Sequence, residues 1–147
     1  QAYHNLNKIA TADRGLKNFT TTEEMYNVIV SMTKKLMADV PFKDVIATGT
    51  CLQNLRTSSL NNSMCLTRDG YHMDNGISRY AAACMMFEKL ISPSFDNVKL
   101  DTNAYRYNVS NTTSGSYSTP VTDANAPIAL QAARYALEKP YVVTDMK

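Results

Sequence analysis

Apolar residues recur with a helical period between residues 22 and 38. They fall three or four positions apart and so line one side of a helix: Met25, Val28, Ile29, Met32 and Leu36. Thr21, followed three residues later by Glu24, matches a capping box and predicts where this helix begins. Pro41 cannot continue a helix. The pattern therefore predicts an amphipathic helix over residues 22–38.

A second pattern, over residues 44–50, is short, apolar and rich in β-branched side chains. Such a run between a helix and a glycine is typical of a buried strand in a parallel sheet. A helix followed by a strand indicates the α/β class. Because open parallel sheets bind ligands at the carboxyl ends of their strands, Gln53, Asn54 and Arg56 are candidates for binding substrate.

Helical periodicity returns over residues 76–91 and again from about residue 123 to residue 138. We expect the first of these helices to turn one set of residues inward: Ile77, Tyr80, Ala81, Cys84, Phe87 or Glu88, and Ile91. The second should turn another set inward: Ile128, Ala129, Ala132, Ala133, Ala136 and Leu137. Pro93 and Pro140 end the two helices, and Pro127 is tolerated in a first turn. Residues 96–120, between the helices, are predicted to be a polar excursion.

Composition places the chain in the range of one globular domain or a large piece of one, with 147 residues, 44% hydrophobic and 19% charged. The net charge is +2, with Lys and Arg scattered along the chain, which argues against nucleic-acid binding. No apolar run approaches the ~20 residues of a membrane span, and the first residues lack a signal-peptide pattern. We therefore expect a soluble chain.

The three cysteines, Cys51, Cys65 and Cys84, have no close spacing of the kind that binds metal. An odd number also argues against a complete disulfide framework. We interpret them as small buried hydrophobic residues, with a Cys51–Cys65 bridge or a cysteine nucleophile as alternatives. Neither a metal nor a cofactor is predicted.

The strongest candidate for chemistry is the pair Asp69 and His72, which lie three residues apart across Gly70. A tight turn can present both side chains on one side. A carboxylate that accepts the Nδ1 proton of an imidazole fixes its tautomer and leaves Nε2 free to take a proton from a nucleophile. The alternative is a surface loop in which Asp69 caps the following helix and His72 is solvated.

Several segments together resemble the C-terminal half of SGNH (GDSL-type) hydrolases, in an uncharacterised bacterial branch. They are Thr48-Gly49-Thr50 with Gln53, Asn54 and Arg56, then Arg68-Asp69-Gly70-Tyr71-His72, and Gly76 with Arg79-Tyr80-Ala81-Ala82-Ala83. The likeness runs from about residue 3 to residue 91 and more loosely through the last helix. It implies that residues 1–147 are one partial domain.

The resemblance implies a fold and an activity. The fold would be the C-terminal portion of a three-layer α/β/α, flavodoxin-like domain, mostly helical as a fragment. The activity would be that of a serine ester hydrolase acting on O-acyl esters such as acetylated carbohydrate, with Asp69 and His72 as the catalytic Asp-x-x-His. A periplasmic or secreted location is weakly favoured on the same basis.

The sequence departs from the family pattern because it has neither a Gly-Asp-Ser block nor a Gly-x-Asn-Asp block. None of Ser58, Ser59 and Ser63 has the strand-to-turn setting that exposes a nucleophile. We therefore expect the chain to associate, through an apolar face, with the missing N-terminal half, a second chain or a copy of itself. The alternatives are a catalytically dead binding module and an unrelated α/β domain.

Overall fold

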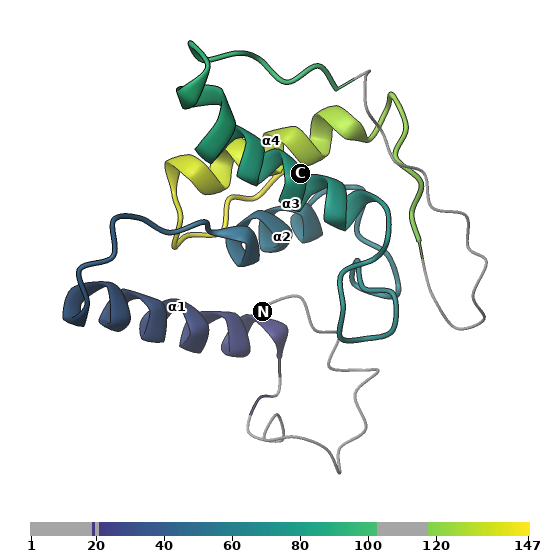
Figure 1. Ribbon diagram of the computed structural model, residues 1–147. Coiled ribbons are helices and arrows are strands. Elements are labelled where there is room, and N and C mark those ends of the chain that lie inside the picture. Colours follow the sequence, from purple (N-terminus) through teal and green to yellow (C-terminus); the bar gives the residue numbers. More distant parts are fainter. Residues whose placement is uncertain (1–18, 20, 103–117) are drawn as a thin grey trace.

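The computed structural model describes residue 19, residues 21–102 and residues 118–147 (Figure 1). The α-helices in these residues are α1 (Thr22–Asp39), α2 (Thr48–Thr57), α3 (Ile77–Met86) and α4 (Ala126–Glu138). A π-helical segment, Phe87–Ile91, and a short 3-10 helix, Ser92–Ser94, continue α3. The mostly helical character expected of the chain is confirmed for these residues, and the middle of the predicted excursion, residues 103–117, lies outside them.

Helix α1 begins where its capping box predicted. The Thr21 hydroxyl accepts a hydrogen bond from the Glu24 N–H at 3.0 Å, and the Glu24 carboxylate accepts one from the Thr21 N–H at 3.4 Å. These two contacts satisfy main-chain donors that the first turn of a helix leaves free. The boundaries predicted from the sequence are therefore confirmed to within one residue.

The predicted strand over residues 44–50 is not formed in the described part of the chain. Residues 41–47 have no regular secondary structure, and Thr48, Gly49 and Thr50 belong to the first turn of α2. A strand needs a neighbour for its main-chain N–H and C=O groups, and no described segment pairs with residues 41–47. Gly49, which suggested the end of a strand, instead lies in the first turn of α2.

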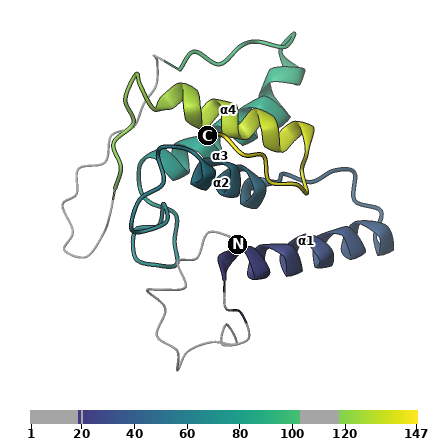
Figure 2. The same ribbon diagram turned by 180° about the vertical axis from the view of Figure 1, so that it is seen from behind.

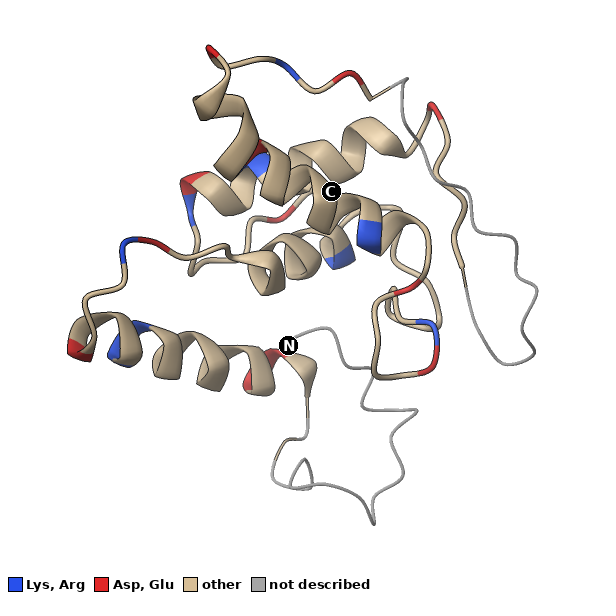
Figure 3. Ribbon diagram, viewed as in Figure 1, with Lys and Arg blue, Asp and Glu red and all other residues tan. Residues whose placement is uncertain are grey.

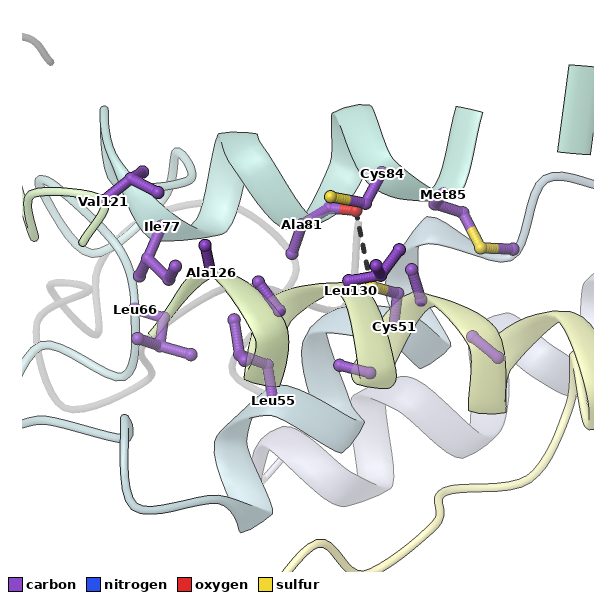
Figure 4. Packing of buried hydrophobic residues seen from close by; sticks show 14 of the residues in the cluster. Cys51, Leu55, Leu66, Ile77, Ala81, Cys84, Met85, Val121, Ala126 and Leu130 are labelled. Atoms are coloured by element: carbon purple, nitrogen blue, oxygen red, sulfur yellow. Dashed lines mark hydrogen bonds between the residues drawn. The ribbon is translucent and has the colours of Figure 1, made fainter. Parts of the chain in front are cut away.

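Helices α2, α3 and α4 pack into one hydrophobic core (Figures 1 and 4). Much of this core consists of small or medium side chains that are buried: Ala47, Cys51, Leu55, Leu66, Ile77, Ala81, Cys84, Met85, Val121, Ala126, Ala129, Leu130, Ala132, Ala133 and Ala136. Alanines on α3 and α4 allow the two helices to approach closely. The inward face predicted for α4 is confirmed at Ala129, Ala132, Ala133 and Ala136, each 0% exposed.

The end of α3 differs from the prediction. Ile91, expected to point inward, is 44% exposed, because the helix widens into the π-helical segment before it reaches this residue. Extra residues in a turn rotate all later side chains around the axis. Glu88, in the same segment, accepts a hydrogen bond from Arg134 of α4 at 3.0 Å.

After α4 the chain runs back across α2. The Thr50 hydroxyl donates to the Pro140 carbonyl at 2.6 Å. Asn54 accepts the Thr144 N–H at 2.7 Å, and its amide donates to the Ala132 carbonyl at 3.2 Å. These contacts join α2 to the last helix and to the C-terminal segment. We call α2, α3, α4 and the C-terminal segment together the body.

Helix α1 lies apart from the other helices, along one side of the body, in both opposite views (Figures 1 and 2). Its neighbours are the connecting segment 41–47, one side of α2 and the C-terminal segment. Side chains along one side of it are exposed, namely Val28 at 47%, Met32 at 62% and Leu36 at 50%. The predicted apolar stripe therefore exists, but much of it faces solvent.

The surface chemistry agrees with the composition. Acidic and basic residues are scattered along the described helices and connecting segments in the view of Figure 3. The cysteines are free, with Cys51 and Cys84 buried, so the alternative of a Cys51–Cys65 bridge is wrong for this structure. Burial raises the pKa of the Cys51 thiol to about 12, which keeps it protonated. Within residues 21–102 and 118–147, no helix is both long and apolar enough to cross a membrane.

Candidate functional site

The Asp69–His72 pair sits at the tip of a short hairpin-like loop that precedes α3. Thr67 and Met73 face each other across an isolated antiparallel bridge. Inside this bridge, the Arg68 N–H donates to the His72 carbonyl at 3.0 Å. Gly70 takes φ 92°, a left-handed conformation that residues with a side chain rarely adopt. The loop therefore reverses direction between Asp69 and His72.

The base of this loop is tied to the body through the main chain of Leu66. Its carbonyl accepts hydrogen bonds from the Asp74 N–H at 3.0 Å and from the buried Ser78 hydroxyl of α3 at 2.7 Å. Cys65 and Leu66 both have positive φ, 50° and 60°. Backbone strain of this kind costs about 1 to 3 kcal/mol per residue and persists only where surrounding contacts impose it. The loop base is thus held in a fixed, strained shape.

The imidazole of His72 and the carboxylate of Asp69 are in hydrogen-bonding contact. The distance between His72 Nδ1 and Asp69 Oδ2 is 2.7 Å. The other carboxylate oxygen, Oδ1, accepts the N–H groups of Tyr71 at 2.9 Å and of His72 at 2.8 Å. Asp69 therefore holds the turn with one oxygen and the imidazole ring with the other.

The charge state of Asp69 decides the tautomer of His72. Partial burial alone would raise the pKa of this carboxyl, but the hydrogen bonds from His72 and the charges of His72 and Arg68 together hold it below its usual range. An ionised carboxylate can only accept hydrogen bonds. Nδ1 must then carry the proton, which leaves Nε2 of a neutral ring as the proton acceptor.

The His72 side chain is 61% exposed, against 36% for Asp69. In the described part of the chain, no serine or cysteine makes a hydrogen bond to the ring, and Asp69 is its hydrogen-bond partner. Tyr71 lies beside it, with ring centroids 6.4 Å apart and planes tilted by 50°. The predicted contact between the Asp69 carboxylate and His72 Nδ1 is present. Its catalytic role stays a prediction, and the nucleophile has no counterpart among the described residues.

The proposed substrate residues Gln53, Asn54 and Arg56 lie on α2, away from this loop tip. Gln53 and Arg56 line a cavity of about 450 Å³ between α1, α2 and residues 141–143, whose lining includes neither Asp69 nor His72. Asn54 is 0% exposed and uses its amide in the core contacts to Ala132 and Thr144. The structure therefore does not bring the three residues together with the His72 ring.

Arg56 has a definite structural position. Its Nε donates to the Cys65 carbonyl at 3.0 Å, which ties α2 to the strained loop base. Burial lowers the pKa of its guanidinium to about 10, still well above neutral pH, so the group remains charged. Arg56 thus acts on the loop through the main chain and not through the imidazole.

Asp74, which the sequence pattern did not single out, has the helix-capping role that was suggested as an alternative for Asp69. Asp74 is 0% exposed, and its Oδ1 accepts the N–H groups of Gly76 at 2.8 Å and of Ser78 at 3.3 Å. It therefore caps the start of α3. Burial raises the pKa of its carboxyl, and hydrogen bonds from Gly76, Ser78 and Thr119 oppose this only in part. A carboxylate two residues before the glycine of a helix start was the signal for this role.

Gly76 is the second residue that the sequence analysis did not explain. A β-carbon at this position would lie 1.8 Å from the Thr119 carbonyl oxygen, so only glycine fits. The same carbonyl accepts the Ile77 N–H at 3.0 Å. Residues 118–121 therefore press directly on the junction between the loop and α3. Among the described residues, no three His, Cys, Asp or Glu side chains are grouped so as to hold a metal.

Residues 5–122 match the family described as Domain of unknown function (DUF4886), and the chain belongs to this family. A crystal structure of a DUF4886 family protein from Bacteroides uniformis ATCC 8492, at 1.50 Å resolution, is similar, with 30% sequence identity and a TM-score of 0.71. The similarity covers 98% of this chain and 48% of that protein, so the chain spans about half of the relative's length. The comparison with curated proteins gives no match.

Proposed function

We propose that this chain is the C-terminal part of an SGNH-type serine ester hydrolase, in which Asp69 and His72 are the acid–base pair. The observation that carries the proposal is the 2.7 Å contact between His72 Nδ1 and Asp69 Oδ2 in a ring that is 61% exposed. The strained loop base and the buried cap Asp74 support it, because such fixed loops are common where side chains must be held for chemistry.

In the proposed reaction, Nε2 of His72 takes the proton of a serine hydroxyl as the serine oxygen attacks the ester carbonyl. The ring then gives this proton to the leaving alcohol, and an acyl-enzyme remains. In the second step His72 takes a proton from water as the water oxygen attacks the acyl carbonyl. The ring then returns a proton to the serine oxygen, and the acid is released. Asp69 keeps the ring in the required tautomer and stabilises the imidazolium while it exists.

The nucleophilic serine and the donors of the oxyanion hole would come from the half of the domain that this chain does not cover. Together the two halves would form the three-layer α/β/α fold. Loss of one oxyanion donor commonly costs about 3 to 4 kcal/mol of transition-state stabilisation. We therefore expect the 147-residue chain alone to be nearly inert as an esterase. O-acyl esters, such as acetylated carbohydrate, are the proposed substrate class.

The test uses this chain together with a polypeptide that supplies the part of the domain it does not cover. The substrate is p-nitrophenyl acetate. His72→Ala should lose at least about a thousandfold in kcat, and Asp69→Asn somewhat less, as for other triads. Because the base must start neutral, kcat/KM should also fall in acid. His4→Ala, at the other histidine of the sequence, is the matched control and should keep its rate.

Circular dichroism must show that each variant is folded. If folded His72→Ala hydrolysed the ester at the wild-type rate, His72 would not be the base. Asp69→Asn is informative because an amide oxygen can still accept the Tyr71 and His72 N–H groups. The turn is then kept, while the charge that fixes the imidazole is lost.

The second candidate is a binding module without catalysis. Asp69 Oδ1 already holds the turn through two N–H groups, so the loop needs no catalytic role to explain this carboxylate. In that case the preparation with both halves would show no ester hydrolysis, and Asp69→Ala would affect only the stability of the loop.

A further inference from the structure

Helix α1 has an apolar arc wider than the surface that it buries. Successive residues turn by about 100° around a helix. Tyr26, Ile29, Val30 and Thr33 point toward the body and line a cavity of about 160 Å³ against residues 45–50 and 140–141. The positions beside them around the helix axis are apolar too, but their side chains are not covered by the rest of the described chain.

These positions form what we call the outer stripe: Val28, Met32 and Leu36. The three lie four residues apart, on one line along the helix, with exposures of 47%, 62% and 50%. Phe42, which follows the end of α1, is also exposed, at 52%. An apolar row of this length, facing solvent, is typical of a surface that another polypeptide covers.

Helix α1 is held in its place mainly at its first turns, where Met25 and Tyr26 are 3% and 4% exposed. The Tyr26 hydroxyl bonds Thr50 Oγ1 of α2 at 2.8 Å, and Lys34 Nζ lies 5.2 Å from the centroid of the Tyr141 ring. Helices in proteins derive most of their stability from packing an apolar face against other elements. This 18-residue helix leaves Val28, Met32 and Leu36 exposed, so it has stabilisation still to gain.

The segment that follows α1 is also incomplete. Residues 41–47 carry apolar β-branched side chains, but their main-chain hydrogen bonds stay local. The Phe42 N–H donates to the Val40 carbonyl, and the Ile46 carbonyl accepts from the Thr48 N–H, each two residues away. No hydrogen-bond ladder joins this segment to another described segment, so it is available to pair with a chain that lies outside the described residues.

We propose that the outer stripe and residues 41–47 together form the surface that receives the part of a DUF4886 family protein that this chain does not cover. Two facts favour this occupant. The chain matches the solved relative over 98% of its own length but only 48% of the relative's, so that protein has a second half of equal size. The surface also offers both an apolar helix face and the irregular segment 41–47 beside it, whereas helix pairing between two copies would use only the first.

The inference rests on family membership and on these surfaces, and not on ester hydrolysis. A complex between the halves that lacks esterase activity would therefore leave this proposal standing and count against the proposed function. If the halves failed to associate, the proposal about the surface would be overturned, and the ester-hydrolysis test would still decide the proposed function.

The experiment mixes the purified 147-residue chain with the part of the Bacteroides uniformis protein that it does not match, made as a separate polypeptide. Sedimentation velocity should show a complex with one copy of each. Hydrogen exchange should show new protection over α1 and residues 41–47. Met32→Glu should weaken the complex at least about tenfold, since it buries a charge in the contact.

Two variants serve as matched controls. Ser31→Glu places the same charge on the polar side of α1, and Phe95→Glu places it on a different exposed apolar residue, after α3, that is 65% exposed. Both should leave the affinity unchanged. The proposal is overturned if no complex forms, if Phe95→Glu is the variant that weakens it, or if the chain instead pairs with itself through the outer stripe.

Discussion

Helices α2, α3 and α4 bury their apolar sides against one another, whereas α1 buries only part of its own. Leu55 of α2 is 0% exposed, and Leu36 of α1 is 50% exposed. Both are leucines on amphipathic helices of the same chain. The difference lies in what surrounds them, since α2 is enclosed by α3, α4 and the C-terminal segment, and α1 has the body on one side only.

We therefore expect the body and α1 to differ in how they unfold. The body has a core of its own and should unfold as a cooperative unit. The stability of α1 depends on one face and a few polar contacts, so it belongs to the low-stability end of the molecule. The Asp69–His72 loop is anchored to the body through Leu66, Asp74 and Gly76, and it should therefore keep its geometry even when α1 moves.

The largest contrast should come from the same substitution in the two regions. Leu55→Ala removes a fully buried side chain and should cost about 2 to 5 kcal/mol of unfolding free energy, because the core cannot fill the cavity. Leu36→Ala should change it by less than about 0.5 kcal/mol. Urea unfolding followed by circular dichroism measures both. Equal losses would mean that the chain covers the outer stripe by itself.

A smaller effect is expected at the junction between the loop and α3. Gly76→Ala would place a methyl group 1.8 Å from the Thr119 carbonyl oxygen, so residues 118–121 must move away. Overpacking of this kind costs about 1 to 3 kcal/mol. Ser31→Ala, on the polar side of α1, is the control and should be silent. An unchanged unfolding midpoint for Gly76→Ala would mean that residues 118–121 do not brace the loop.

The sequence predicted those features that depend on neighbours in the chain. The capping box of Thr21 and Glu24, the terminal helix and the Asp69–His72 contact all follow from spacings of three or four residues. The catalytic role of the pair stays a prediction. Helix α2 was not predicted because the β-branched run and Gly49 suggest a strand. The sequence alone does not show that Cys51 and Leu55 are buried against other helices.

Features that depend on distant segments could not be predicted. Only the approach of Thr119 explains why residue 76 must be glycine. The exposure of Met32 is the same kind of case. Periodicity identifies a residue as apolar and places it on a face, but it contains no information on which surface covers that face.

The two carboxylates of the loop should affect stability with opposite dependence on pH. Burial raises the pKa of Asp74 above its ordinary 3.8, so the folded state binds the proton more tightly than the unfolded state. Its contribution to stability is then complete below the unfolded pKa and is lost as pH rises through the folded pKa. Asp69 has a lowered pKa, and its contribution is lost as pH falls.

Asp74→Asn tests this sign. The amide can still accept the Gly76 N–H but cannot ionise, so the variant avoids the cost of a buried charge. Relative to the wild type, its unfolding free energy should therefore increase as pH rises from about 4 toward neutral. Urea unfolding at several pH values gives the difference. A constant difference, or one of the opposite sign, would show that the Asp74 carboxylate is not destabilised by its burial.

The smallest expected effect concerns the capping box of α1. Thr21→Ala removes the hydroxyl that accepts the Glu24 N–H, a loss of about 1 kcal/mol for the helix. Because α1 packs little against the body, this loss should appear as faster hydrogen exchange in its first turns, with the unfolding midpoint of the body unchanged. Thr22→Ala is a neighbouring control. If Thr21→Ala lowered the midpoint by the full amount, α1 would unfold together with α2, α3 and α4, and the distinction between the two regions would be wrong.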